Sequence, residues 1–164
     1  EEALKLGILY DVLLEFDHTE GLGDLNENSV NTDFIENLIT FGLTPVVNAI
    51  THDGNGQLLN TNADTIAQEV AKAMSSLYEV SLIYSFEKAG VLLDANDDAT
   101  VISNIDPTSY EQLKAEGKIF AGMIPKLDNA FAALNSGVKK VVIGKAEQLK
   151  DLINGESGTS ITNS

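Results

Sequence analysis

The sequence predicts an α/β fold, a three-layer α/β/α sandwich in which helices cover both faces of a mainly parallel sheet. Segments with apolar residues at helical spacing alternate with short, almost continuously apolar runs, and such runs are typical of parallel strands buried on both faces. Glycine or proline stands at most boundaries between the segments. The 164 residues, 43% of them hydrophobic, suffice for one core.

The first half of the chain is predicted to form a helix, a strand, a second helix and a second strand. Apolar residues recur at helical spacing between positions 30 and 41, and Gly42 ends this helix. Residues 43–50 then form a predicted buried strand, with a proline near its start. After a turn-rich stretch, the apolar residues between 66 and 77 predict a long helix, and residues 80–86 a strand.

The second half repeats this alternation. Residues 95–98 are predicted as a loop before a short strand at 100–102, and Pro107 is expected to open a helix. Pro125 fits the first position of another helix, which Gly137 ends. The remaining predictions are a strand, a short helix and a closing strand, at residues 138–143, 146–153 and 158–161. Ligands of such folds bind at the carboxyl ends of the strands.

Charge narrows the possible partners. Ten basic residues, all lysine, stand against 25 acidic ones, which gives a net charge of −15. The resulting field repels nucleic acids and anionic membranes, so neither is an expected partner. An anionic ligand would need magnesium and a few well-placed lysines, because there is no arginine to supply a bidentate fork.

The composition also bears on metal sites and compartment. The sequence has no cysteine, which excludes disulfides and thiolate nucleophiles. Its two histidines, His18 and His52, lack the spacing of metal ligands, so no protein-bound metal is expected. No signal peptide is expected, and the sequence has no apolar run near the ~18 residues of a membrane span. A cytoplasmic location is therefore expected.

Three polar residues, Asn60, Asn62 and Asp64, alternate just before the predicted helix at 66–77. They could be no more than an N-cap series, because Asn and Asp commonly accept hydrogen bonds from free amides at helix starts. Alternatively, Asn60 donates to a substrate carboxylate and Asp64 holds lysine ammonium groups in position. Three polar residues where one cap would suffice favour the functional interpretation.

Lys126 lies in the first turn of a predicted helix, where the helix dipole makes a cation unfavourable by a few tenths of a kcal/mol. A phosphate held by the amides of the same helix start would compensate, and Lys126 could then stabilise a transferring group. The alternative is a surface lysine whose apolar stem packs along the protein.

The segment Glu87–Leu92 follows the predicted strand at 80–86. Glu87 could accept hydrogen bonds from ribose hydroxyls, and Gly90 would let the backbone approach a nucleotide. A plain turn would explain the same residues. Residues 94–98 superficially match a calcium loop, but Ala99 and Ile105 replace the required glycine and glutamate. The sequence also lacks a P-loop and a Gly-x-Ser-x-Gly elbow, which excludes those NTPase and hydrolase classes.

Six short motifs occur in the order found in N-acetylglutamate kinases, a branch of the amino-acid kinases, and the chain resembles that family over residues 17–161. The strand-end segment Phe86-Glu87-Lys88 is similar to the Bacteroidetes branch, which includes enzymes that prefer N-succinylglutamate. The matching motifs are Gly23-Asp24, Pro45-Val46-Val47, Asn60 to Asp64, Gly90-Val91-Leu92, Gly122-Met123-Ile124-Pro125-Lys126 and Gly158-Thr159.

The resemblance implies an amino-acid kinase or carbamate kinase-like fold and ATP-dependent phosphorylation of the side-chain carboxylate of an N-acylglutamate in arginine biosynthesis. ATP with Mg²⁺ would be the phosphoryl donor, and a homo-oligomer is expected. By match, Lys126 and Asp64 would be catalytic, as the transition-state lysine and the organiser of lysines. Asn60 and Asn62 would contact the substrate. The nucleotide would be lined by Glu87, Lys88, Ala89, Gly90, Val91, Leu92, Lys118, Ile119, Phe120, Gly122 and Met123.

The front of the chain departs from the family. The family's N-terminal lobe carries a glycine-rich phosphate loop with its own lysine and a substrate-clamping arginine, and none of these is in the sequence. Residues 1–16 contain none of these motifs and are left unassigned, so residues 17–164 are expected to be the ATP-binding portion of a larger kinase domain. The alternative is a non-catalytic module of the same fold, used for nucleotide binding or oligomerisation.

Overall fold

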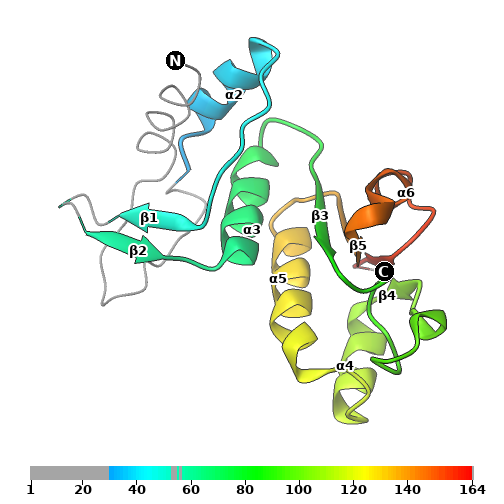
Figure 1. Cartoon of the computed structure of the whole chain (residues 1–164). Helices are drawn as coiled ribbons and strands as arrows, with labels where there is room; N and C mark the ends of the chain where they lie inside the picture. The colour runs from blue at the N-terminus through cyan, green and yellow to red at the C-terminus, as the bar shows by residue number, and fades with distance from the viewer. Residues whose placement is uncertain (1–29, 53–54, 56, 164) are drawn as a thin grey trace. The chain divides into compact units, whose positions relative to one another are not determined.

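The computed structural model describes residues 30–52, 55 and 57–163, and these residues divide into two compact units. The first unit runs to Met74 and the second begins at Ser75 (Figure 1). The Gly23-Asp24 motif, residues 1–16 and His18 lie outside the described residues.

The described part of the first unit holds two helices and a β-hairpin. Helix α2 (Thr32–Thr40) begins where the Asn31 side chain accepts a hydrogen bond from the Phe34 amide at 3.0 Å. Strands β1 (Ile50–His52) and β2 (Leu58–Asn60) pair antiparallel, and α3 (Ala63–Met74) follows. Both predicted helices are confirmed, whereas the hairpin was not expected.

The second unit is built on a four-stranded sheet in the order β3-β5-β6-β4. The pairs β3–β5 and β4–β6 are parallel, and β5–β6 is antiparallel. Two of the three pairings are therefore parallel, in agreement with the predicted mainly parallel sheet. The strands are β3 (Ser81–Phe86), β4 (Asn104–Ile105), β5 (Lys140–Lys145) and β6 (Thr159–Ile161).

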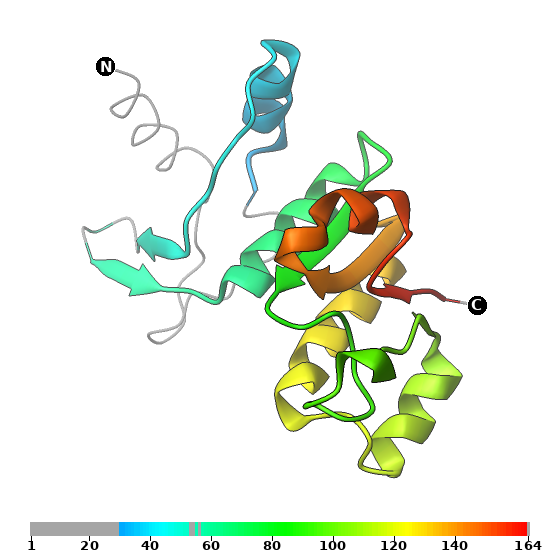
Figure 2. The same ribbon diagram turned by 45° about the vertical axis from the view of Figure 1, so that its right-hand side comes forward.

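Helices cover both faces of the β3–β5 pair (Figure 2). A Cβ added to Gly144 of β5 would meet Leu152 of α6, so the face of β5 on which Gly144 lies is turned toward α6. Ile143 points to the other face, with its paired residue Tyr84, and there the side chain of Lys126 from α5 reaches the Tyr84 ring. The helices are α4 (Pro107–Ala115), α5 (Ile124–Asn135) and α6 (Leu149–Asn154), with short 3₁₀ turns η2 (Asp98–Thr100), η3 (Ala121–Met123) and η4 (Ala146–Gln148).

The predicted strand at residues 43–50 is wrong. Only Ile50 belongs to a strand, and Leu43 and Val46 are 56% and 72% exposed. A strand needs a neighbour for its ladder of hydrogen bonds, and this apolar run reaches one at its end, where Ile50 pairs with β2 and the Ala49 carbonyl accepts from the Thr61 amide at 2.9 Å. Pro45, which has no amide hydrogen, weakens pairing further.

The predicted strand at 100–102 is also misplaced. Asp97 accepts a hydrogen bond from the Ala99 amide at 2.9 Å and caps the 3₁₀ turn η2 instead. Val101 forms only an isolated bridge with Leu92, and the true strand β4 begins three residues later, at Asn104. Local side-chain capping thus overrides the apolar pattern.

Candidate functional site

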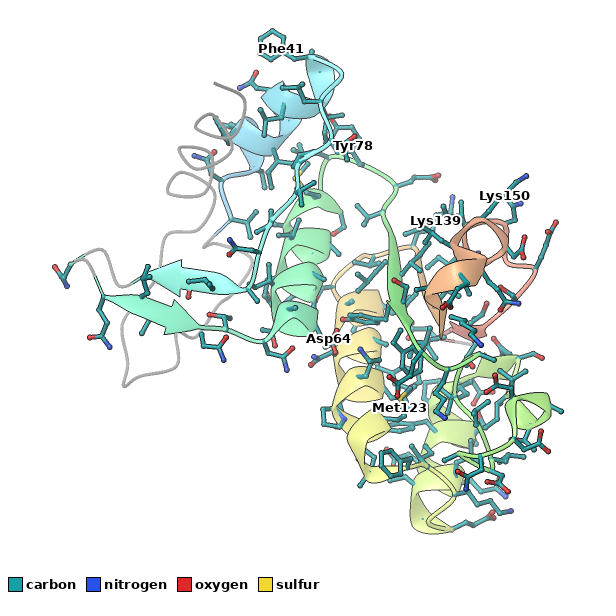
Figure 3. The ribbon with its side chains drawn as sticks, in the orientation of Figure 1. Phe41, Asp64, Tyr78, Met123, Lys139 and Lys150 are labelled. Atoms are coloured by element: carbon teal, nitrogen blue, oxygen red, sulfur yellow. The ribbon has the colours of Figure 1, made fainter. Side chains whose placement is uncertain are left out.

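A cavity of about 410 Å³ lies at the carboxyl end of β3, beside the start of α5. Its volume is in the range of small-molecule sites, and its place at a strand end agrees with the general rule for α/β folds. Met123, labelled in Figure 3, marks this end of the second unit. The lining residues are Phe86, Glu87, Lys88, Gly90, Leu92, Ala95, Asn96, Phe120, Gly122, Met123 and Lys126.

A larger hollow, about 640 Å³, lies at the starts of β3 and β5, where Lys139 and Lys140 line it. Lys139 there forms an exposed ion pair with Glu79 at 2.6 Å. Because ligands of parallel sheets bind at the opposite strand ends, the cavity at the end of β3 is the better candidate.

The loop after β3 is fixed by a buried threonine of β6. The Oγ1 atom of Thr159, a fully buried side chain, accepts a hydrogen bond from the Val91 amide at 2.8 Å. A Cβ on Gly90 would lie 2.6 Å from the same oxygen, so glycine is required here by packing against β6. Gly90, which the sequence predicts to contact a nucleotide, thus has a structural role that the sequence could not reveal.

The next turns of this loop are held by local hydrogen bonds. Lys88 donates to the Ala95 carbonyl at 3.0 Å, and the Asp94 carboxylate accepts from the Asn96 amide at 2.9 Å. Thr100 donates to the Asp97 carbonyl at 2.6 Å. These acidic side chains therefore act as turn formers, in keeping with the rejection of a calcium loop.

Lys126 lies in the first turn of α5, next to Pro125, and its side chain reaches back over the sheet. Its Nζ atom is 4.6 Å from the centre of the Tyr84 ring and 5.9 Å from that of Phe86. Contacts of this kind contribute about 0.5–1 kcal/mol when exposed and ~2 when desolvated. The two rings therefore supply part of the stabilisation that a cation at a helix start requires.

The same helix is anchored on its other side by Tyr110 of α4. The Tyr110 hydroxyl donates to Asp128 Oδ1 at 2.6 Å, and its ring packs on Phe131 with centres 5.2 Å apart. Burial, and then the Asp128 carboxylate, raise the pKa of Tyr110 well above its ordinary value. Lys114 completes the cluster, 5.0 Å from the Tyr110 ring centre and 3.8 Å from Asp128 Oδ1.

The Asn60–Asp64 segment belongs to the first unit. Asn60 ends β2 and is exposed, and the Asn62 side chain accepts a hydrogen bond from the Asp64 amide at 2.8 Å. Asn62 thus makes the capping contact at the start of α3, while Asp64 stands half-buried in the first turn, where a carboxylate is favourable. Between these residues, the Thr61 hydroxyl shares a hydrogen bond of 2.7 Å with the hydroxyl of the buried Thr51.

The cavity brings together most of the residues predicted to bind nucleotide. Glu87, Lys88, Gly90, Leu92, Phe120, Gly122 and Met123 line it with the predicted catalytic Lys126. Ala89, Val91, Lys118 and Ile119 are outside the lining: Val91 and Ile119 are buried, and Lys118 pairs with Glu116 at 2.7 Å. The sequence reasoning missed Phe86, Ala95 and Asn96. Two signals for Phe86 were available: it adjoins the predicted Glu87 in the strand-end motif, and it follows Tyr84 by two positions on the same strand.

Among the described residues there is no group of three or more histidine, aspartate or glutamate side chains placed to share a metal ion. In the same part of the chain, no helix is long and apolar enough to cross a membrane.

Fold and site together define an α/β protein with a cavity of small-molecule size at the end of a parallel strand. The model of the amino acid kinase family matches residues 6–145, and the chain belongs to this family.

Named relatives agree with this membership. The chain is 51% identical to the acetylglutamate kinase of Cytophaga hutchinsonii over 133 residues, 81% of this chain and 50% of that protein. It is 52% identical to the acetylglutamate kinase of Bacteroides thetaiotaomicron over 130 residues, 79% of this chain and 50% of that protein. The chain thus spans about half the length of these relatives.

Solved structures confirm the fold. An N-acetylglutamate synthase of Neisseria gonorrhoeae, solved with coenzyme A and N-acetylglutamate, superposes with a TM-score of 0.72 at 18% identity, over 93% of this chain and 38% of that one. A carbamate kinase of Giardia lamblia bound to AMP-PNP gives 0.59 at 17% identity, over 82% and 50%. The predicted amino-acid kinase fold is therefore correct.

Proposed function

We propose that the protein containing this chain is an N-acylglutamate kinase, which transfers the γ-phosphoryl group of ATP to the side-chain carboxylate of N-acetyl- or N-succinylglutamate in arginine biosynthesis. The observation that carries the proposal is Lys126, whose side chain lines the cavity at the end of β3. The names of the relatives support it, since they are called acetylglutamate kinases at about 50% identity.

In this proposal the cavity takes the nucleotide. Phe86, Leu92, Phe120 and Met123 offer apolar surface for a base, and Glu87 at the rim could accept hydrogen bonds from ribose hydroxyls. Lys126 would then meet the phosphates and stabilise the charge on the transferring group. These lining residues fit ATP. Its Mg²⁺ would be bound by the phosphate oxygens rather than by a cluster of protein carboxylates.

For the polar residues of the first unit, the proposal follows the family resemblance. We propose that Asn60 donates to the α-carboxylate of the substrate, that Asn62 also contacts the substrate, and that Asp64 organises lysine ammonium groups. Catalysis would rest on positioning and on charge stabilisation, without a covalent enzyme intermediate.

A coupled assay of ADP release from the natural full-length protein tests the proposal, with N-acetylglutamate and N-succinylglutamate as acceptors. We expect ATP turnover that depends on one of the two and on Mg²⁺. The result against the proposal is acceptor-independent ATP hydrolysis, or none, in a protein that still binds ATP; it would favour the alternative of a non-catalytic nucleotide-binding or oligomerisation module.

A further inference from the structure

We propose that the rings of Tyr84 and Phe86 form an aromatic seat that positions the Lys126 ammonium group for phosphoryl transfer; the inference rests on the catalytic role proposed for Lys126. The observation behind it is the pair of distances from Lys126 Nζ, 4.6 Å to the Tyr84 ring centre and 5.9 Å to that of Phe86. Tyr84 and Phe86 are thus positioning residues.

The geometry of a β-strand builds this seat. Residues two apart on a strand point to the same face, so Tyr84 and Phe86 of β3 lie side by side beneath α5. Tyr84 is only 4% exposed and is paired in register with Ile143, which is fully buried. The inner ring of the seat therefore has no room to move, while Phe86, nearer the carboxyl end of β3, lines the cavity.

The helix that carries the lysine is held just as firmly. Leu127, the next residue, is fully buried, and Asp128 accepts the hydrogen bond from Tyr110 of α4 at 2.6 Å. With the Tyr84 ring and the helix backbone held in place, the position of the ammonium group depends on the conformation of the four-carbon stem of Lys126. The seat restricts this conformation before a nucleotide binds, which reduces the reorganisation required for the reaction.

An aromatic ring suits a catalytic ammonium group for an electrostatic reason. The negative face of the ring attracts the cation but carries no net charge, so it does not cancel the positive charge needed by the phosphoryl oxygens. It also accepts no strong directional hydrogen bond that phosphate would have to replace. Because the rings lie along β3 toward the cavity, the seat directs the ammonium group toward the bound phosphates.

The test weakens the seat without changing its shape. In the natural full-length protein, Tyr84→Phe keeps the ring, and the same substitution with mono-, di- and trifluorinated rings removes negative charge from the ring face stepwise. We expect kcat to fall progressively, by about tenfold over the series, while KM for ATP changes by less than about twofold. The same fluorinated series at Tyr110, whose ring lies under Lys114, is the matched control; each variant is compared with Tyr110→Phe, so that the loss of the hydroxyl cancels, and fluorination should cause no further change in kcat.

Proton NMR of the Lys126 ε-methylene group gives an independent readout, because ring currents move protons above an aromatic face upfield. We expect this upfield shift in the Tyr84→Phe protein and its loss in Tyr84→Leu. Absence of the shift would refute the seat, and a flat kcat series with the shift present would refute its positioning role. A wild-type protein without phosphoryl transfer would instead refute the proposed function, while the shift still tests the contact.

Discussion

Two lysines of the second unit lie over tyrosine rings, yet their surroundings differ. Lys114 is 5.0 Å from the Tyr110 ring centre, and its charge is partly met by Asp128, 3.8 Å away. Lys126 is 4.6 Å from the Tyr84 ring centre and lines the cavity at the end of β3. The same local contact therefore serves as a structural anchor in the first case and, in our account, as part of an active site in the second.

The neighbours of a lysine–aromatic contact decide its role. The Tyr110 cluster ties α4 to α5 through a hydroxyl, a carboxylate and an ammonium group that satisfy one another. The Tyr84 contact instead stands at the boundary between the core and the cavity, where a ligand can reach the ammonium group. The first arrangement should affect stability, and the second the rate of reaction.

The largest difference is expected from removing each lysine charge in turn. Lys126→Met should lower kcat by about 10²–10³-fold, because stabilisation of the transferring phosphoryl group is lost. Lys114→Met removes a cation over a tyrosine in the same way and should leave kcat within about twofold of wild type. The ADP-release assay measures both; equal losses of kcat would remove the distinction between the two contacts.

The second-largest effect is expected when the loop after β3, which lines the cavity, loses its hydrogen bond to Thr159. Thr159→Val keeps the shape of a fully buried side chain but leaves the Val91 amide without its acceptor, at a cost of about 1–3 kcal/mol. We expect lower stability and weaker ATP binding, measured by denaturant unfolding and by calorimetric titration.

Thr159→Ser keeps the hydroxyl and serves as the control for this change. It should restore ATP affinity even though it loses a methyl group. If the valine and serine variants bound ATP equally well, the hydrogen bond from Val91 would have no part in shaping the site.

A smaller effect, on stability alone, is expected when the hydrogen bond between Tyr110 and Asp128 is removed. Tyr110→Phe removes the hydroxyl that donates to Asp128, whose side chain is 54% exposed and can bind water instead. The loss should be about 0.5–1.5 kcal/mol of unfolding free energy, with kcat unchanged. Chemical denaturation gives the first quantity and the kinase assay the second; a clear fall in kcat without loss of structure would place the anchor in the active site.

The smallest predicted effect is a change in unfolding free energy that appears only at alkaline pH. Burial, Asp128 and Glu111 raise the pKa of Tyr110 in the folded protein, against the opposing charge of Lys114 nearby. Because the folded pKa lies above the ordinary 10.0, the stabilisation is complete below pH 10 and is lost as the pH rises toward the folded value. Unfolding free energy should therefore fall faster above pH 10 in wild type than in Tyr110→Phe, as pH-dependent denaturation curves can show.

The sequence predicted well those elements that have local start and stop signals. Pro107 opens α4 behind an Asp106 cap, and Pro125 lies in the first turn of α5, which Gly137 follows in a left-handed conformation. The apolar run at 43–50 failed because hydrophobicity gives no information about which strand is available as a neighbour. The hairpin of β1 and β2 was missed for the same reason.

The ordered motifs identified residues of the candidate site. They did not identify the contacts that hold these residues in place. The resemblance placed Glu87, Gly90 and Lys126 in one site, and the cavity brings these residues together. The hydrogen bond from Val91 to Thr159 joins residues 68 positions apart, and no local pattern predicts it. The contact of Lys126 with Tyr84 likewise depends on how α5 packs over β3.

We propose that the nucleotide binds in the cavity beside Lys126 and not in the larger hollow at the opposite strand ends. Amide NMR spectra recorded during titration with ATP and Mg²⁺ distinguish these two sites. We predict shifts at Gly90, Gly122 and Met123, and none at Lys140 or Thr162 in the other hollow. Shifts confined to Lys140 and Thr162, or no shifts at saturating ATP, would contradict the account.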